Sequence, residues 1–256
     1  TTRGVMLTAF GRDVYHQAQD ICQRFAYLQN APKTSKAEHL SVSSMYCSLA
    51  NDAFVEMFTR HYGDEFTCNL EECMLFDVIR QVSTGLTEIG VVTIFSDGEA
   101  LALRKLEDAG LEFNLILRRP LHAIIGPQNP LYHEERESVT LEELREFPCV
   151  INYASPGDFS GERIWEGGAR RNAEVLVSDL GSALQIVSRT NAIAIDTYDA
   201  ETYRTFYAAN DCKYLALKDA PIDCKLGWVM PKNHTLSQAC GEFLEILREK
   251  AELTAR

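Results

Sequence analysis

Apolar residues near the start of the chain recur with heptad spacing, at successive intervals of 4, 3, 4 and 3. The positions are Val14, Ala18, Ile21, Phe25 and Leu28. Thr8 is a suitable N-cap, because its hydroxyl can accept from an orphan amide of the first turn, and Pro32 provides a stop. The spacing predicts one long helix that packs against a second helix in a dimer. The alternative is a helix that packs on its own globular body.

From residue 40 onward, short strand-like runs alternate with helical patterns. Strand patterns occupy 40–44, 66–70 and 89–95, and helical patterns occupy 51–62, 74–83 and 99–109. Residues 31–38 between the first helix and this body have linker composition. Alternation of this kind predicts parallel sheets that are covered by helices.

The alternation is interrupted twice. Two strand patterns, 111–117 and 121–125, are split by Arg118-Arg119-Pro120, and two more, 213–217 and 225–230, by residues 218–221. Between these breaks the expected helices are 141–147, 162–166 and 180–188, and the expected strands are 149–152, 174–177 and 192–195; a final helix spans 236–253. Two crossings imply a hinge between two α/β lobes. The predicted domains are 1–36 for the helix, 38–118 with 224–256 for lobe I, and 119–223 for lobe II.

Composition and charge narrow the class of protein. The 256 residues are 46% hydrophobic and 24% charged, as in an ordinary soluble globular protein, and the net charge is −12. Such an acidic chain is unsuited to tracking a phosphate backbone, although residues 1–36 carry five basic against two acidic side chains, a charge of +3. Eight scattered cysteines without a C-x-x-C pair indicate free thiols. We expect a cytoplasmic protein with no membrane partner, no metal and no cofactor.

Several short motifs resemble the family of LysR-type transcriptional regulators. The most specific is Leu-Thr-x-x-Gly at residues 7–11, which in that family leads from the wing of a winged helix into a linker helix. The others follow in family order: Glu-Ile-Gly-Val at 88–91, Pro-Gln-Asn-Pro-Leu at 127–131, Thr-Leu-Glu-Glu-Leu at 140–144 and Leu-Gly-Trp-Val-Met at 226–230. Together they cover essentially the whole chain.

This resemblance implies a fold, partners and a mode of action. The fold would be two Rossmann-like lobes of the periplasmic-binding-protein type 2 kind, preceded by the linker and dimerisation helix. A small-molecule effector would bind between the lobes and change the geometry of a homodimer or tetramer on DNA. DNA would be contacted through a winged helix-turn-helix domain that this chain lacks.

Candidate effector ligands lie where strands lead into helices, because ligands of α/β sheets settle beyond the carboxyl ends of the strands. In the first lobe they are Ser43, Ser44 and Tyr46; in the second they are Asn152, Ser155, Ser178, Asp179 and Thr197. Plain helix capping explains Ser178 and Asp179 equally well. Because Asp179 and Asp196 contribute negative charge, the sequence favours a neutral or partly cationic effector.

Three other classes of function are alternatives to an effector-binding regulator. A redox-sensing regulator of the same family would need a reactive thiol, and Cys68, Cys73, Cys212 and Cys224 keep that alternative open, although Glu71 and Glu72 give Cys73 the wrong electrostatic surroundings. A solute-binding receptor would share the two lobes but would not need a heptad helix. The chain has no nucleophile elbow, phosphate loop, dinucleotide fingerprint or H-E-x-x-H motif, so no catalytic residue is expected.

Overall fold

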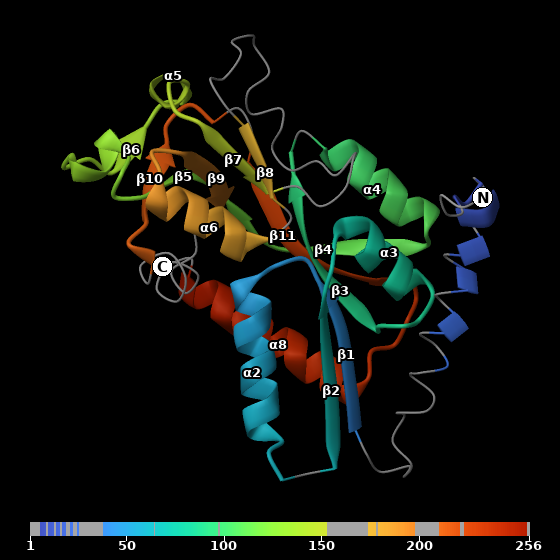
Figure 1. Ribbon diagram of the computed structural model, residues 1–256. Coiled ribbons are helices and arrows are strands. Elements are labelled where there is room, and N and C mark those ends of the chain that lie inside the picture. Colours follow the sequence, from blue (N-terminus) through green and yellow to red (C-terminus); the bar gives the residue numbers. More distant parts are fainter. Residues whose placement is uncertain are drawn as a thin grey trace.

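The strands of the protein form two separate sheets, drawn in Figure 1. The computed structural model describes residues 6–8, 10–12, 14–15, 17–18, 21–22, 25, 38–63, 65–96, 98–152, 174–177, 179–197, 210–220 and 223–254. One sheet has five strands in the order β2-β1-β3-β11-β4, and the other has six in the order β6-β10-β5-β9-β7-β8. All the strand patterns identified in the sequence appear as strands, with ends that differ by two residues or fewer.

The five-stranded sheet is mixed rather than parallel. β1 (Glu38–Ser44) runs parallel to β2 (Phe66–Glu72) and β3 (Ile89–Phe95), as the alternation predicts. β11 (Cys224–Pro231) is antiparallel to both β3 and β4 (Leu111–Arg119), so the expectation of parallel strands is wrong for β11. The reason is that β11 enters this sheet from the other one, and therefore runs back from the end at which β4 leaves.

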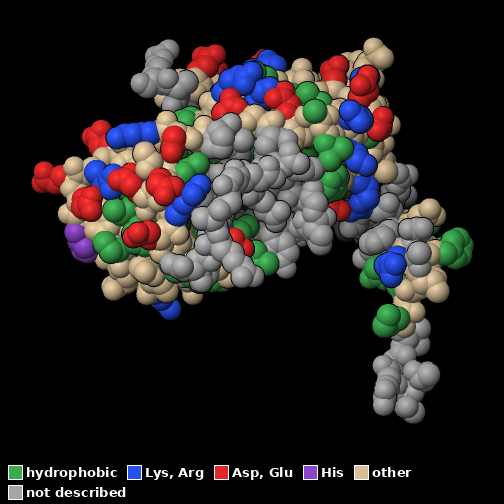
Figure 2. Space-filling model, turned by 90° about the horizontal axis from the view of Figure 1, so that it is seen from above, with side chains coloured by type: hydrophobic (Ala, Val, Ile, Leu, Met, Phe, Trp, Pro, Cys, Tyr) green, Lys and Arg blue, Asp and Glu red, His purple; other side chains and the backbone are tan. Residues whose placement is uncertain are grey.

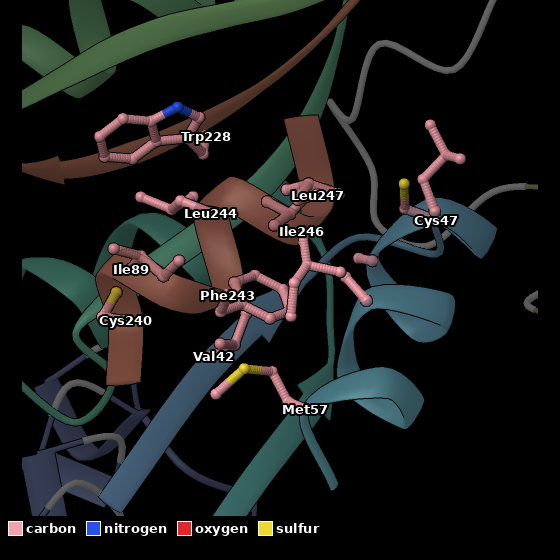
Figure 3. Packing of buried hydrophobic residues seen from close by; sticks show 14 of the residues in the cluster. Val42, Cys47, Met57, Ile89, Trp228, Cys240, Phe243, Leu244, Ile246 and Leu247 are labelled. Carbon is pink, nitrogen blue, oxygen red and sulfur yellow. The ribbon is translucent and has the colours of Figure 1, made fainter. Parts of the chain in front are cut away.

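Helices cover both faces of the five-stranded sheet. α2 (Ser48–Arg60) and α8 (Gln238–Thr254) share one hydrophobic core with β1, β3 and β11. α3 (Leu75–Ser83) and α4 (Glu99–Asp108) share a second core on the other face. Figure 3 shows the first core, in which Phe243 from α8 lies among side chains from α2 and β1. This arrangement fixes the α2 N-terminus at the carboxyl end of β1.

The six-stranded sheet is also mixed and is covered on both sides. Its strands are β5 (Leu121–Ile125), β6 (Ser138–Val139), β7 (Cys149–Asn152), β8 (Glu174–Val177), β9 (Ile193–Thr197) and β10 (Lys213–Leu217). β7 is parallel to β8 and β9, whereas β5 is antiparallel to β9 and β10. α6 (Leu180–Arg189) contributes to one core, and the 3-10 turn η1 (Pro130–His133) and α5 (Leu141–Leu144) to the other.

Two helix predictions in this region have different outcomes. α5 begins after the predicted cap Thr140, which forms a capping box with Glu143, but it ends at Leu144 rather than residue 147. Pro148 accounts for the exclusion of Phe147 from the helix, because a proline disfavours helical backbone in the residue before it. The predicted helix 162–166 lies outside the described residues.

The N-terminal segment is helical at each of its described positions from Phe10 to Phe25. Thr8 acts as the predicted N-cap, since its Oγ1 accepts a 3.0 Å hydrogen bond from the amide of Gly11. The described heptad positions Val14, Ile21 and Phe25 have 47%, 67% and 61% of their surface exposed. Figure 2 shows this segment standing apart from the main body, at the right of the view. Its apolar side chains are therefore not covered by the chain's own lobes.

Candidate functional site

The two serines at the end of β1 are buried and hydrogen-bonded within the protein. Ser43 Oγ lies 3.0 Å from Thr87 Oγ1, and Ser44 Oγ donates to the carbonyl of Met45 over 2.6 Å. Ser44 is 2% exposed. Both residues lie at the predicted junction, but their hydroxyl groups already serve to hold the β1 end in place.

The N-terminus of α2 follows directly after this junction. Cys47 is its N-cap, with extended backbone, and its side chain makes no capping hydrogen bond. The first amides of a helix have no partner within the helix, and they carry the positive end of its dipole. Such a terminus favours an anionic group or another hydrogen-bond acceptor. Tyr46, which was predicted from the sequence, precedes this cap, and its hydroxyl is shielded from solvent.

Ser48 is a residue of this junction that the sequence reasoning missed. It is the first residue of α2 and is 5% exposed, yet its Oγ has no hydrogen-bond partner among the described residues. Leaving a buried hydroxyl unpaired costs about 1–3 kcal/mol, so the group is suited to a ligand that supplies the missing bond. The sequence signal was a serine immediately before the buried pair Leu49 and Ala50.

The strand-to-helix junctions of the six-stranded sheet offer fewer polar groups that are free to bind a ligand. Asp179 is the N-cap of α6, and its Oδ1 accepts a 2.8 Å hydrogen bond from the amide of Ser182, which lowers the pKa of the Asp179 carboxyl. Thr197, at the end of β9, donates its amide to Asp196 Oδ1 over 2.7 Å. Asn152 is the last residue of β7. Ser155 and Ser178 lie outside the described residues.

A buried arginine lies where the chain crosses between the sheets. Arg119, the last residue of β4, is only 8% exposed and is paired in register with Cys224. Burial raises the pKa of the Cys224 thiol to about 12; Arg119 opposes this rise and Asp196 of β9 adds to it. Phe95, at the end of β3, packs against the core of the six-stranded sheet. The strand ends of the two sheets therefore come together around a buried arginine.

The four cysteines considered for redox sensing have raised pKa values, the opposite of what a reactive thiol needs. Burial raises the pKa of Cys73 to about 12, with a further contribution from Glu71, and raises the pKa of Cys212 to about 11. Burial also raises the pKa values of Cys68 and Cys240. Oxidation proceeds through the thiolate, which is scarce near neutral pH when the pKa is this high. The thiol chemistry therefore gives no support to the redox alternative.

Other kinds of site find no support in the described part of the chain. No helix there is long and apolar enough to cross a membrane. No group of three or more His, Cys, Asp or Glu side chains is placed to hold a metal ion within the same residues. The junction at α2 and the crossing remain the places where polar groups gather beside strand ends.

Two α/β lobes joined by two strand crossings, with helix N-termini at the strand ends, define a ligand-binding domain of the periplasmic-binding-protein type 2 kind. A family model described as "LysR substrate binding domain" matches residues 56–252. The chain therefore belongs to this family and carries the effector-binding domain of a LysR-type regulator.

Solved structures with the same fold share little sequence with this chain. The effector-binding domain of BenM with its effector benzoate is 15% identical, with a TM-score of 0.65 and coverage of 87% of this chain and 95% of that one. The effector-binding domain of QuiR in complex with shikimate is 14% identical, with a TM-score of 0.61 and coverage of 85% and 99%. Full-length CbnR complexed with its target DNA is 16% identical, with a TM-score of 0.65 and coverage of 98% and 86%. A comparison with curated proteins gives no match.

Proposed function

We propose that this protein is the sensor part of a DNA-binding transcriptional regulator and that it binds a small organic acid between its two lobes. Lobe I would comprise residues 38–118 with 224–256, and lobe II residues 119–223. Binding would shift the population of lobe arrangements, and with it the geometry of a homodimer or tetramer on DNA, without a chemical step. DNA would be contacted by a winged helix-turn-helix domain, as the family resemblance implies. No catalytic residue, metal or cofactor is needed.

The buried hydroxyl of Ser48 at the uncapped N-terminus of α2 carries this proposal. A carboxylate placed there would accept from the first-turn amides and from Ser48 Oγ, which has no other partner among the described residues. We propose that the same site is lined by Tyr46, Asn152, Ser155, Ser178 and Thr197. Ser43 and Ser44 would hold the end of β1 in place next to it.

Charge at the site favours an acid over the neutral or cationic effector that the sequence suggested. Asp179 is already stabilised by capping α6, with its Oδ1 accepting from the amide of Ser182, so it has less to gain from pairing with a cation. Arg119 is a buried positive charge at the end of β4, close enough to Cys224 to affect its thiol. The solved complexes of BenM with benzoate and QuiR with shikimate show that this fold accommodates carboxylic acids in two relatives.

Thermal-shift measurements with paired ligands test the proposal. Each aromatic or alicyclic acid is compared with its own carboxamide, so that size and shape stay constant while the charge is removed. We expect at least one acid to raise the melting temperature and its amide to have little effect, because a ligand that binds only the folded state stabilises it by mass action. Ser48→Ala is expected to weaken the binding of that acid roughly tenfold, the loss of about 1.4 kcal/mol from one charge-assisted hydrogen bond.

Ser188→Ala provides the matched control, since Ser188 is a partly buried helical serine whose Oγ donates to Gln185 O over 3.3 Å. It should bind the acid as the wild type does. A panel in which amides and acids stabilise equally, or in which Ser48→Ala binds every hit unchanged, would contradict the placement of a carboxylate at α2.

The exposed heptad helix supports self-association. We propose that the seam of Val14, Ala18, Ile21 and Phe25 packs on the same seam of a second copy. The double change Ile21→Glu and Phe25→Glu is expected to convert a species of at least twice the 28.8 kDa chain mass into one of 28.8 kDa, because it puts like charges into an apolar seam. Light scattering during size-exclusion chromatography measures this. Gln17→Glu, on the same helix but off the seam, should leave the mass unchanged.

A further inference from the structure

The return crossing from β10 to β11 is attached to both lobes by hydrogen bonds at its two ends. At the first end, Lys218 N donates to Val139 O over 3.1 Å, and Asp219 Oδ1 accepts from Leu141 N over 2.9 Å. These contacts lie entirely on the side of the six-stranded sheet. Asp219 thereby also supplies an acceptor for the first amide of α5.

At its second end the same crossing is held by the five-stranded sheet. Ser96 and Asp223 form a reciprocal pair: Ser96 N donates to Asp223 O over 2.9 Å, and Asp223 N donates to Ser96 Oγ over 3.1 Å. Arg118 Nη1 adds a 3.2 Å ion pair with Asp223 Oδ2. Both side chains of this ion pair are well exposed, so we attribute most of the attachment to the Ser96 pair.

The other crossing, from β4 to β5, has few backbone torsions that can change. β4 ends at Arg119 and β5 begins at Leu121, so Pro120 alone separates the two strands. Proline fixes its own φ, which removes one of the torsions about which the lobes could turn. The return crossing, in contrast, is attached at Asp219 and at Asp223 by the hydrogen bonds described above.

We propose that Ser96 and Asp219 are positioning residues of the interlobe hinge, each fixing one end of the return crossing to a different lobe. This deepens the proposed function and rests on it, because the angle between the lobes is the quantity that an effector would change. Ser96 directly follows β3, whose last residue Phe95 packs against the core of lobe II. A ligand bound at the carboxyl end of β3 would thus act next to the attachment that sets the angle.

Distance measurements between the lobes test the inference on the full chain without any effector. A ketone-bearing amino acid is introduced at exposed positions Glu107 on α4 and Gln185 on α6 and labelled there, which avoids the eight cysteines. Pulsed electron paramagnetic resonance then gives the distribution of distances. We expect a narrow distribution for the wild type, and one shifted or broadened by at least about 2 Å, the scale of a domain rearrangement, for Ser96→Ala and for Asp219→Ala.

Two variants of matched chemistry on α3 serve as controls. Ser83→Ala removes a hydroxyl that donates to Arg80 O over 3.1 Å, and Asp77→Ala removes a 3.1 Å ion pair with Arg80. Both should leave the distance distribution unchanged. In Ser96→Ala, hydrogen exchange at the amide of Asp223 should also accelerate while exchange in α2 and α8 stays constant, a pattern that general destabilisation would not give.

The inference is overturned if Ser96→Ala and Asp219→Ala both keep the wild-type distribution while remaining folded by circular dichroism. A variant that does not fold leaves the other variant and the exchange measurement to decide. Because no ligand is used, the outcome is distinct from that of the acid screen: a broadened distribution with no acid binding would uphold the hinge and reject the proposed effector class.

Discussion

Replacing Phe243 with alanine is expected to destabilise the protein by about 3–5 kcal/mol, the usual cost of removing a large buried aromatic side chain. Phe243 has no exposed surface, and it is the largest fully buried side chain of the described residues. Its ring lies among side chains from α2 and β1, so that the space it leaves cannot be filled by movement of α8 alone (Figure 3). Calorimetry should show a melting temperature lower by roughly 6–20 °C.

Leu253→Ala tests whether the loss of stability in Phe243→Ala is caused by the burial of the replaced side chain. Leu253 lies on the same helix with 69% of its surface exposed, and its replacement should change the free energy of unfolding by less than about 0.5 kcal/mol. Equal effects of the two changes would mean that α8 does not dock as described. Phe243→Ala is also expected to weaken ligand binding, because α8 and α2 share the core that holds the α2 N-terminus beside β1.

The periodic parts of the sequence were sufficient to predict most of the fold. Strands β3, β5, β7, β8 and β10 have the bounds that the pattern predicts, because buried runs flanked by turn residues leave little choice of length. The helix N-caps could also be predicted from the sequence, since Thr8, Thr140 and Asp179 all accept hydrogen bonds from backbone amides. These are local interactions, within three residues along the chain, and local sequence therefore determines them.

The antiparallel placement of β11 could not be predicted in the same way. β11 is separated from its partner strands β3 and β4 by more than 100 residues, and its direction depends on the path of the chain through the second sheet. Arg119 is a related case. The sequence placed it at a crossing, but only the pairing of β4 with β11 shows that it is buried beside Cys224.

In the candidate site, the sequence alone also could not predict which hydroxyl groups are available to a ligand. Ser43 and Ser44 were chosen because they end a strand, yet Ser43 faces Thr87, which lies 44 residues further along the chain. Ser48 was missed because the predicted helix began at residue 51, whereas α2 begins at Ser48, whose hydroxyl has no hydrogen-bond partner among the described residues. Which hydroxyl is available depends on long-range packing, and that information is absent from a short motif.

Gly126→Ala is expected to destabilise lobe II by at least about 3 kcal/mol, the upper end of the usual cost of overpacking. A Cβ at this position would lie 2.3 Å from the carbonyl oxygen of Val187 and 2.7 Å from Cα of Ser188. Both are backbone atoms of α6, so no side-chain rotation relieves the overlap. Because Val187 is fully buried, α6 would have to move away from the sheet that it covers.

Gly241→Ala is the same chemical change with the opposite expected sign. Gly241 lies within α8 and has no atom within 4 Å of the added Cβ, so the alanine should stabilise the helix by about 0.5–1 kcal/mol. Urea unfolding of both variants measures the two effects. If Gly126→Ala were as stable as the wild type, α6 would not pack as closely against the end of β5 as described.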